Sequence, residues 1–199
     1  MSSPGVRTPD LSAPGERIAR LDLPVAAMLA LAVALLLVRA WSPTFGAFGR
    51  VAGLTITLIA VLVGSLLVPV ATGRARLHPV LVLGVGAGAV ALALLTSGRP
   101  VAAPIGAWAL PLTALAAVAE EALFRRTMYA TLEQRGAIVA IGVTAFVFAA
   151  MHVPIYGVAV FPVDLGAGAL LSWQRWASGS WAVPAATHAA ANITMTVLR

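Results

Sequence analysis

The chain consists of long apolar runs separated by short polar breaks, and this pattern predicts a bundle of membrane-spanning helices. Most runs approach the roughly 20 residues that an α-helix needs to cross a bilayer. The breaks contain arginine, glycine, serine or proline, which commonly flank or end such helices. We expect an all-α, polytopic transmembrane bundle of about seven spans, within a range of six to eight, over residues 23–38, 51–72, 79–97, about 103–130, 136–152, about 157–173 and 181–198.

The first hundred residues divide into a tail and a group of spans. Residues 1–22 mix arginines and acids with Ser, Pro and Gly, which predicts a disordered tail. A signal peptide would explain the first apolar run, but Arg39 stands where cleavage needs small neutral residues. We therefore favour an uncleaved first helix, about three N-terminal transmembrane helices in 23–100, and a separate transmembrane domain in 101–199.

Composition and charge narrow the class of protein. The chain is 60% hydrophobic and 10% charged, with a mean hydropathy of +0.96, whereas a soluble domain is roughly 25% charged. It has no cysteine, which excludes disulfides, thiolate metal sites and a cysteine nucleophile. The net charge of +6 comes from scattered arginines, which predicts membrane anchors and no nucleic-acid partner. Nine of the 13 arginines fall on the predicted side of the N-terminal tail. This predicts a multi-pass protein of the cell membrane with a cytoplasmic N-terminus.

Four acids follow residue 22, and they are candidates for function because charge inside a bilayer costs at least a few kcal/mol. Glu121 precedes Arg125 by four residues, the favoured order for an ion pair along a helix. Adjacent helical residues project about 100° apart, so Glu120 is left to face elsewhere. Glu133 is typical of a solvated turn, and Asp164 of a helix cap or kink.

Glu120 and His152 are each sixteen residues from Gly136, on opposite sides of it. If the chain turns there as an antiparallel hairpin, equal distances from the turn mean equal depth. Both residues would lie about 20 Å of helix from the turn at 1.5 Å per residue. The spacing therefore predicts an acid and an imidazole at one level inside the membrane.

Two further polar positions share a helix face. His188 and Asn192 are four residues apart, with alanines between them that leave room. The same spacing places Phe148 beside His152, where it would form a wall of the site. His78 is assigned no role, because a single histidine is more often a packing residue.

These residue types suit hydrolysis of an amide by activated water. A carboxylate and a histidine that share one water can act as a general base. A histidine and an asparagine can donate hydrogen bonds to the oxyanion that forms when a carbonyl is attacked. No G-x-S-x-G sequence is present, so serine catalysis is not expected.

Three motifs in order resemble those of a known family. EEALFR at 120–125 fits E-E-x-x-x-R, FAAMH at 148–152 fits F-x-x-x-H, and HAAAN at 188–192 fits H-x-x-x-N. The chain thereby resembles the CPBP intramembrane proteases, also called the CAAX prenyl protease or Abi family, which includes bacteriocin self-immunity proteins. The resemblance covers roughly residues 107–196 and makes 101–199 the expected catalytic domain.

The resemblance implies roles for individual residues. Glu120 would be the base that activates water, with help from His152. The oxyanion would be held by His188 and Asn192. Structural support of the site would come from Glu121 and Arg125. Arg126 departs from the family pattern, in which glycine often follows the motif arginine, and we expect it to anchor the chain at lipid headgroups.

Whether a metal takes part is open at this stage. A catalytic zinc has three protein ligands and one open position, and Glu120, His152 and His188 would be the three. The chain has no H-E-x-x-H pair, and asparagine is a poor zinc ligand. We favour a glutamate-dependent site that requires no cofactor, with a divalent metal such as zinc as the alternative.

Two other functions compete with the protease. One is a non-catalytic membrane immunity or scaffold protein of the same fold, and the other is a proton-coupled transporter that uses the intramembrane Glu and His as a relay. The expected partners of the favoured function are the lipid bilayer and a membrane-associated protein or peptide substrate. The alanine- and glycine-rich helices are also compatible with a homo-oligomer.

Overall fold

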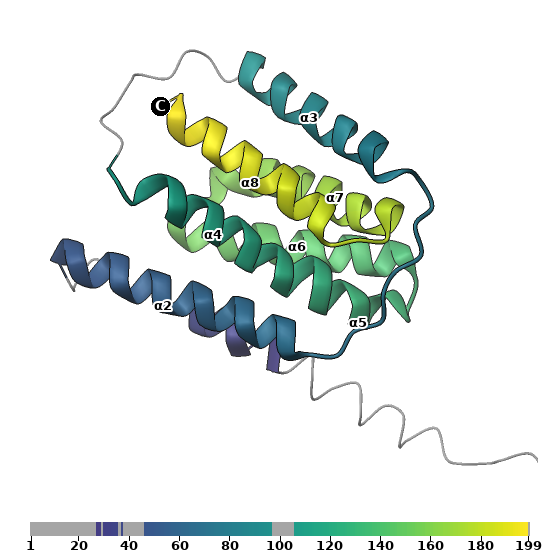
Figure 1. The fold of residues 1–199 in the computed structure, drawn as a ribbon, viewed down its shortest axis with the longest axis horizontal. Helices are drawn as coiled ribbons and strands as arrows, with labels where there is room; N and C mark the ends of the chain where they lie inside the picture. Colours follow the sequence, from purple (N-terminus) through teal and green to yellow (C-terminus); the bar gives the residue numbers. More distant parts are fainter. Residues whose placement is uncertain (1–26, 29, 36, 38–45, 97–105, 199) are drawn as a thin grey trace, which may run out of the picture.

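The computed structural model describes residues 27–28, 30–35, 37, 46–96 and 106–198. Within these residues the regular structure is entirely helical, and the residues described between 27 and 37 are helical too. The elements, drawn in Figure 1, are α2 (Gly46–Leu67), α3 (Pro79–Thr96), α4 (Ala109–Glu121), the π-helix η2 (Ala122–Met128), α5 (Tyr129–Glu133), α6 (Ala137–Tyr156), the 3₁₀-helix η3 (Val158–Val160), α7 (Phe161–Ser178) and α8 (Ala182–Val197). The predicted tail 1–22 lies outside the described residues.

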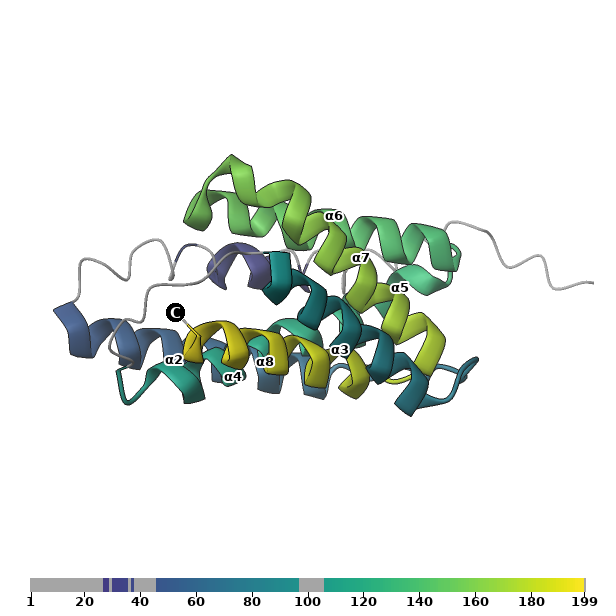
Figure 2. The same ribbon diagram turned by 90° about the horizontal axis from the view of Figure 1, so that it is seen from above.

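The helices pack in two layers. Figure 2 shows α6 on one side of the molecule and α2, α4 and α8 on the other, with α7 running obliquely from the first layer toward the second. α4 contacts both α2 and α8, while α3 packs against α7 and α8. η2 and α5 continue the direction of α4, and the chain then reverses before α6, before α7 and before α8 (Figure 1).

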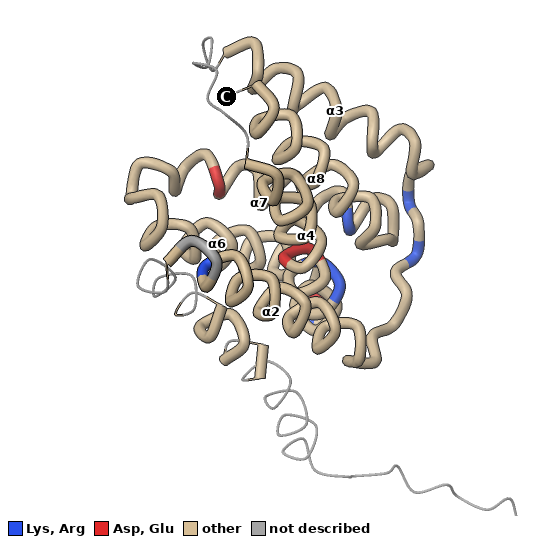
Figure 3. The backbone as a smooth tube through the Cα atoms, turned by 60° about the vertical axis from the view of Figure 1, so that its left-hand side comes forward, with Lys and Arg blue, Asp and Glu red and all other residues tan. Residues whose placement is uncertain are grey.

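Three described helices, α2 from Gly49, α3 and α6, are long and apolar enough to cross a membrane. Large apolar side chains cover their outer faces, including Leu95, which is 84% exposed, and Ile138, which is 88% exposed. Charged positions are few along the tube in Figure 3. An all-helical membrane protein is therefore supported, but the expected number of about seven spans is not confirmed.

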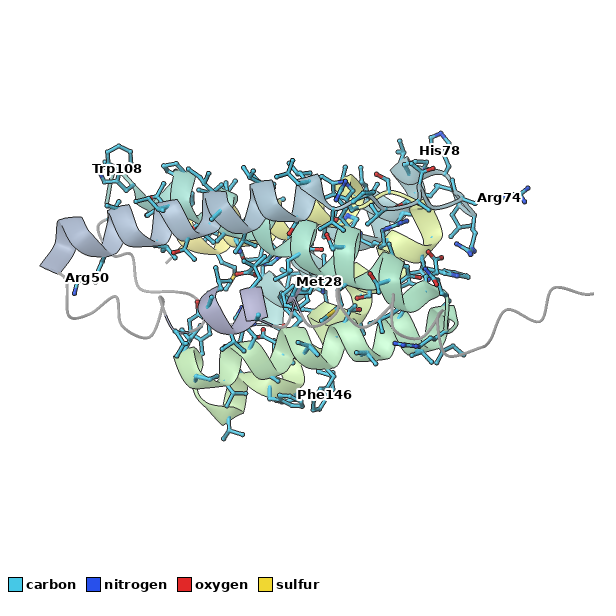
Figure 4. The ribbon with its side chains drawn as sticks, turned by 90° about the horizontal axis from the view of Figure 1, so that it is seen from below. Met28, Arg50, Arg74, His78, Trp108 and Phe146 are labelled. Atoms are coloured by element: carbon cyan, nitrogen blue, oxygen red, sulfur yellow. The ribbon has the colours of Figure 1, made fainter. Side chains whose placement is uncertain are left out.

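Polar anchors lie at the two ends of the helices. In Figure 4, Arg50 and Trp108 lie at one end of the bundle, and Arg74 and His78 lie at the other. Phe146 points outward from the middle of the molecule, whereas Met28 points into it, where it is 4% exposed. This arrangement, with an apolar belt between two polar ends, is typical of a membrane protein.

α3 is joined to α7 and α8 by buried polar contacts. The Gln174 side-chain amide donates to the carbonyl of Val82 at 3.0 Å and to Thr187 Oγ1 at 3.0 Å. The glutamine reaches α3 because Gly86 leaves room: a Cβ there would overlap the Gln174 amide and lie 2.6 Å from Thr187 Oγ1. A glycine inside α3 is thus required by close packing.

Arg126 closes the C-terminal end of α2. Its guanidinium donates to the carbonyls of Ser65, Leu66 and Val68, three of the acceptors that a helix leaves unpaired at its end. The structure thus gives Arg126 a role at the end of a helix that the sequence did not predict, while its expected contact with lipid headgroups stays a prediction. The sequence could not indicate this contact, because it depends on where a distant helix ends.

Candidate active site

A cavity of about 750 Å³ lies between α3, α4, α6, α7 and α8. Its walls come mainly from α4, from the first half of α7 and from the second halves of α3, α6 and α8. The cavity therefore lies toward the end of the bundle that carries Arg50 and Trp108. Small residues line much of it, and the ionisable and amide side chains that reach it are Glu120, His152, Tyr156, Asp164, His188 and Asn192.

Glu120 lies between the two histidines. Its Oε2 atom is 4.0 Å from Nε2 of His152 and 4.0 Å from Nε2 of His188. α5 ends at Glu133 and α6 begins at Ala137, with Gly136 at a φ of 110° in the turn. The structure thus places Glu120 and His152 at one level, as their equal spacing from the turn predicts.

The partners of the Nδ1 atoms determine how each imidazole presents Nε2. His152 Nδ1 is 2.8 Å from the carbonyl oxygen of Phe148. A carbonyl only accepts hydrogen bonds, so Nδ1 carries the proton. His188 Nδ1 is 2.9 Å from Glu121 Oε1, which holds that ring in the same way. In the neutral rings both Nε2 lone pairs therefore face Glu120.

Glu121 and Arg125 form a buried ion pair beneath the cavity. Both side chains are 0% exposed, and Arg125 Nη1 donates to Glu121 Oε1 at 2.7 Å. Arg125 Nη2 donates to the carbonyl of Gly168 in α7 at 3.1 Å. Since Glu121 Oε1 also bonds His188, this pair links α4, α7 and α8. The predicted i,i+4 pair is confirmed.

Phe148 packs against both imidazoles. Its ring centroid is 4.7 Å from that of His152 and 5.7 Å from that of His188, and the latter pair is edge-to-face. The guanidinium of Arg125 lies 4.6 Å from the ring centroid. Phe148 is 3% exposed and lines the cavity, so it forms a wall that fixes the histidines, as its spacing from His152 predicts.

Comparison with known families agrees with this arrangement. Residues 102–194 match the family model of the type II CAAX prenyl endopeptidases that are Rce1-like. The matched segment is just under half of the 199 residues, and it contains all three motifs. Over residues 102–194, below called the Rce1-like domain, the chain is similar to this family. The resemblance to CAAX proteases is thereby confirmed and supports a membrane protease. No curated protein and no solved structure gave a match.

In the Rce1-like domain, Asn192 lies one turn beyond His188 on α8 and lines the same cavity. The four candidate catalytic side chains thus share one cavity. Glu133 is remote from them, at a distance of 3.8 Å from Arg76 in an ion pair at the other end of the bundle. The interpretation of Glu133 as a turn residue therefore agrees with its position.

Asp164 is a further polar side chain of this site, and its position was not predicted. Its Oδ2 atom is 3.6 Å from His152 Nδ1, and the side chain lines the cavity. The interpretation as a cap or kink overlooked the hairpin between α6 and α7. His152 is five residues before Gly157, where this second turn begins, and Asp164 is seven residues after it.

The donor atoms of the Rce1-like domain do not fit a zinc site in this arrangement. Within the described ranges, no three His, Asp or Glu side chains are grouped so that they could hold a metal ion. The separations of 4.0 Å between Glu120 and each histidine are wide for ligands that each bind zinc at about 2.0 Å in a tetrahedron. We therefore derive the chemistry for a water molecule.

Proposed function

We propose that the chain is an intramembrane endopeptidase in which Glu120 activates the water that attacks a peptide bond. The observation that carries the proposal is one carboxylate oxygen with two imidazole Nε2 atoms at 4.0 Å, on the wall of a cavity of about 750 Å³. A cavity of that size is in the range of sites that enclose part of a ligand. The Rce1-like domain supports the same class of reaction.

The first step is attack by water on the carbonyl carbon of the scissile bond. Glu120 Oε2 takes a proton from the water while the oxygen forms a bond to carbon. His152 Nε2, with its lone pair toward Glu120, accepts a hydrogen bond from the same water and orients it. A water at ordinary hydrogen-bond distance from both Glu120 Oε2 and His152 Nε2 is compatible with the 4.0 Å between these atoms.

The second step is collapse of the tetrahedral intermediate. His188 Nε2 and the Asn192 amide donate hydrogen bonds to the oxyanion. For Nε2 to donate while Nδ1 is bonded to Glu121, the His188 ring must carry both protons, and the negative charge of Glu121 stabilises that form. The carbon–nitrogen bond then breaks, and Glu120 returns its proton to the leaving amine, giving a carboxylic acid and an amine.

The proposal extends to location and partners. The chain would be a multi-pass protein of the cell membrane with its N-terminus in the cytoplasm, acting on a membrane-associated protein or peptide. Among the described arginines, Arg50 is the one that lies at the end of the bundle nearer the cavity. Apart from Arg125 of the buried ion pair, the other described arginines support a cytoplasmic location for the end of the bundle that carries Arg74 and His78. The mechanism requires no cofactor.

The proposal is tested by comparing peptide N-termini in membranes of cells that express the native chain, Glu120→Gln or His78→Ala at matched levels. His78 is exposed at the end of the bundle away from the cavity, so its variant is the matched control. New N-termini should appear with the native chain and His78→Ala and be absent with Glu120→Gln. If folded Glu120→Gln gave the native set of termini, Glu120 would not be the base. If no form produced new termini while the native phenotype persisted, the scaffold function would replace the protease.

A further inference from the structure

Each histidine of the cavity has a carboxylate beside its Nδ1 atom. His188 Nδ1 is 2.9 Å from Glu121 Oε1, and His152 Nδ1 is 3.6 Å from Asp164 Oδ2. Glu121 belongs to the first of the three motifs, whereas Asp164 belongs to none of them. The two imidazoles are nevertheless arranged alike, with Nε2 toward Glu120 and Nδ1 toward a second acid.

Asp164 is held in this position by the packing of α7 on α6. One turn further along α7, Gly168 lies so close to α6 that a Cβ would be 3.0 Å from the Ala145 Cα atom. One turn beyond that, Ser172 Oγ is 2.8 Å from Thr144 Oγ1 of α6. Since residues four apart share a helix face, the same face of α7 presents Asp164 to α6.

His152 is the nearest charged neighbour of the carboxylate, and Glu120 and His188 also act on it electrostatically. Asp164 Oδ2 is buried and makes no hydrogen bond in the described structure, and the His152 Nδ1 atom lies 3.6 Å from it. Asp164 lies in the first turn of α7, where a helix favours negative charge. Burial opposes ionisation, and a neighbouring N–H dipole favours it.

We propose that Asp164 is a positioning residue that keeps the proton of His152 on Nδ1. The Phe148 carbonyl accepts a hydrogen bond from Nδ1–H at 2.8 Å. In the other tautomer the Nδ1 lone pair would face both this carbonyl and the Asp164 carboxylate, and the repulsion between them disfavours that tautomer. Nε2 then keeps its lone pair toward Glu120. The catalytic consequence rests on the proposed function, but the effect on the tautomer does not.

The tautomer is measured directly by ¹⁵N NMR of histidine-labelled, full-length protein in lipid nanodiscs. The chain has three histidines, so His78→Ala and His152→Ala assign the signals. Asp164→Asn should shift the His152 signals away from the Nδ1-protonated form and leave those of His188 unchanged. Asp164→Glu should keep most of the native pattern. Unchanged His152 signals in folded Asp164→Asn would overturn the proposal. The same shift of the His152 signals in Glu121→Gln would also overturn it, because the effect would then not be specific to Asp164.

Cleavage of a substrate found by the N-terminus comparison gives the second readout. Asp164→Asn should lower kcat about tenfold or more, because an imidazole protonated on Nε2 cannot accept the hydrogen bond from the attacking water. KM should change less than about twofold. Asp164→Glu should recover most of kcat. A native kcat in Asp164→Asn with altered His152 signals would overturn the catalytic part of the proposal. If the native chain cleaved nothing, the proposed function would fail, and the NMR result would still decide the role of Asp164.

Discussion

Glu121→Gln removes one negative charge from a place that water does not reach. The Glu121 and Arg125 side chains are both 0% exposed and are joined at 2.7 Å. Glutamine preserves the shape and one acceptor oxygen. The variant therefore isolates the loss of charge beside Arg125 and His188, with little change in packing.

The size of the effect follows from the contacts that remain. Removing one partner of a buried ion pair typically costs about 3–5 kcal/mol, because the other charge stays buried without compensation. Arg125 keeps its hydrogen bond to the Gly168 carbonyl at 3.1 Å and its place over the Phe148 ring at 4.6 Å. These contacts favour the lower end, so we expect the free energy of unfolding to fall by about 3 kcal/mol.

A double variant separates stability from activity. Glu121→Leu with Arg125→Met removes both charges, and replacing a buried pair by apolar residues is often neutral or stabilising. We expect this variant to regain most of the lost stability. It should remain inactive, because His188 Nδ1 has lost the oxygen 2.9 Å away that orients its ring.

The assay is reversible unfolding of the purified chain in mixed micelles, followed by the fluorescence of its five tryptophans, with peptide cleavage measured on the same samples. A loss below about 1 kcal/mol in Glu121→Gln would contradict the buried pair, since even one lost charged hydrogen bond is worth more. Native cleavage by the double variant would contradict the role of Glu121 in orienting His188.

Three further predictions use the packing of the bundle. Gly86→Ala should lower the free energy of unfolding by about 1–3 kcal/mol through overlap with α7 and α8. Gly88→Ala, on the same helix with open space around it, should not destabilise the chain in the same unfolding assay. Arg126→Ala should cost about 1–2 kcal/mol, because three carbonyls at the end of α2 lose their donor, and faster proteolysis near residue 68 would report it. Ala191→Leu narrows the cavity and should lower kcat/KM about tenfold with stability almost unchanged, whereas Ala190→Leu, which is exposed and does not line the cavity, should retain native cleavage.

The sequence predicts the helical segments well, because an apolar run in a membrane protein is almost always a helix. The helices differ from the predicted ranges mainly at their ends: α4 begins at Ala109, where about 103 was predicted, and α6 continues to Tyr156, past the predicted 152. Pro154 lies within the last turn of α6 and does not end it. The number of crossings is harder to predict, because helices such as α7 carry Asp164 and Arg175 that only the fold pairs.

The π-helix at Ala122–Met128 could not be predicted from the apolar pattern. It follows the two adjacent acids directly and contains Arg125. Thr127 Oγ1 donates to the carbonyl five residues earlier, that of Ala122, at 3.1 Å, which is the spacing of the widened turn. π-Helical turns often occur at functional sites, but their stability depends on tertiary contacts such as those of Arg125, and no local sequence period specifies them.

The position of Asp164 shows that the depth argument applies to every hairpin of a membrane bundle. Around Gly136, Glu120 and His152 lie at one depth because both are sixteen residues from the turn. Around Gly157, His152 lies five residues before the turn and Asp164 seven after it, and the extra residues are taken up by the 3₁₀ turn η3 at Val158–Val160. One histidine thus belongs to two hairpins at once. A polar residue that lies at the same depth as a partner in both of its neighbouring helices is far less expected by chance than one that pairs once. Counting residues outward from both turns that flank His152 therefore identifies the two acids on either side of its imidazole.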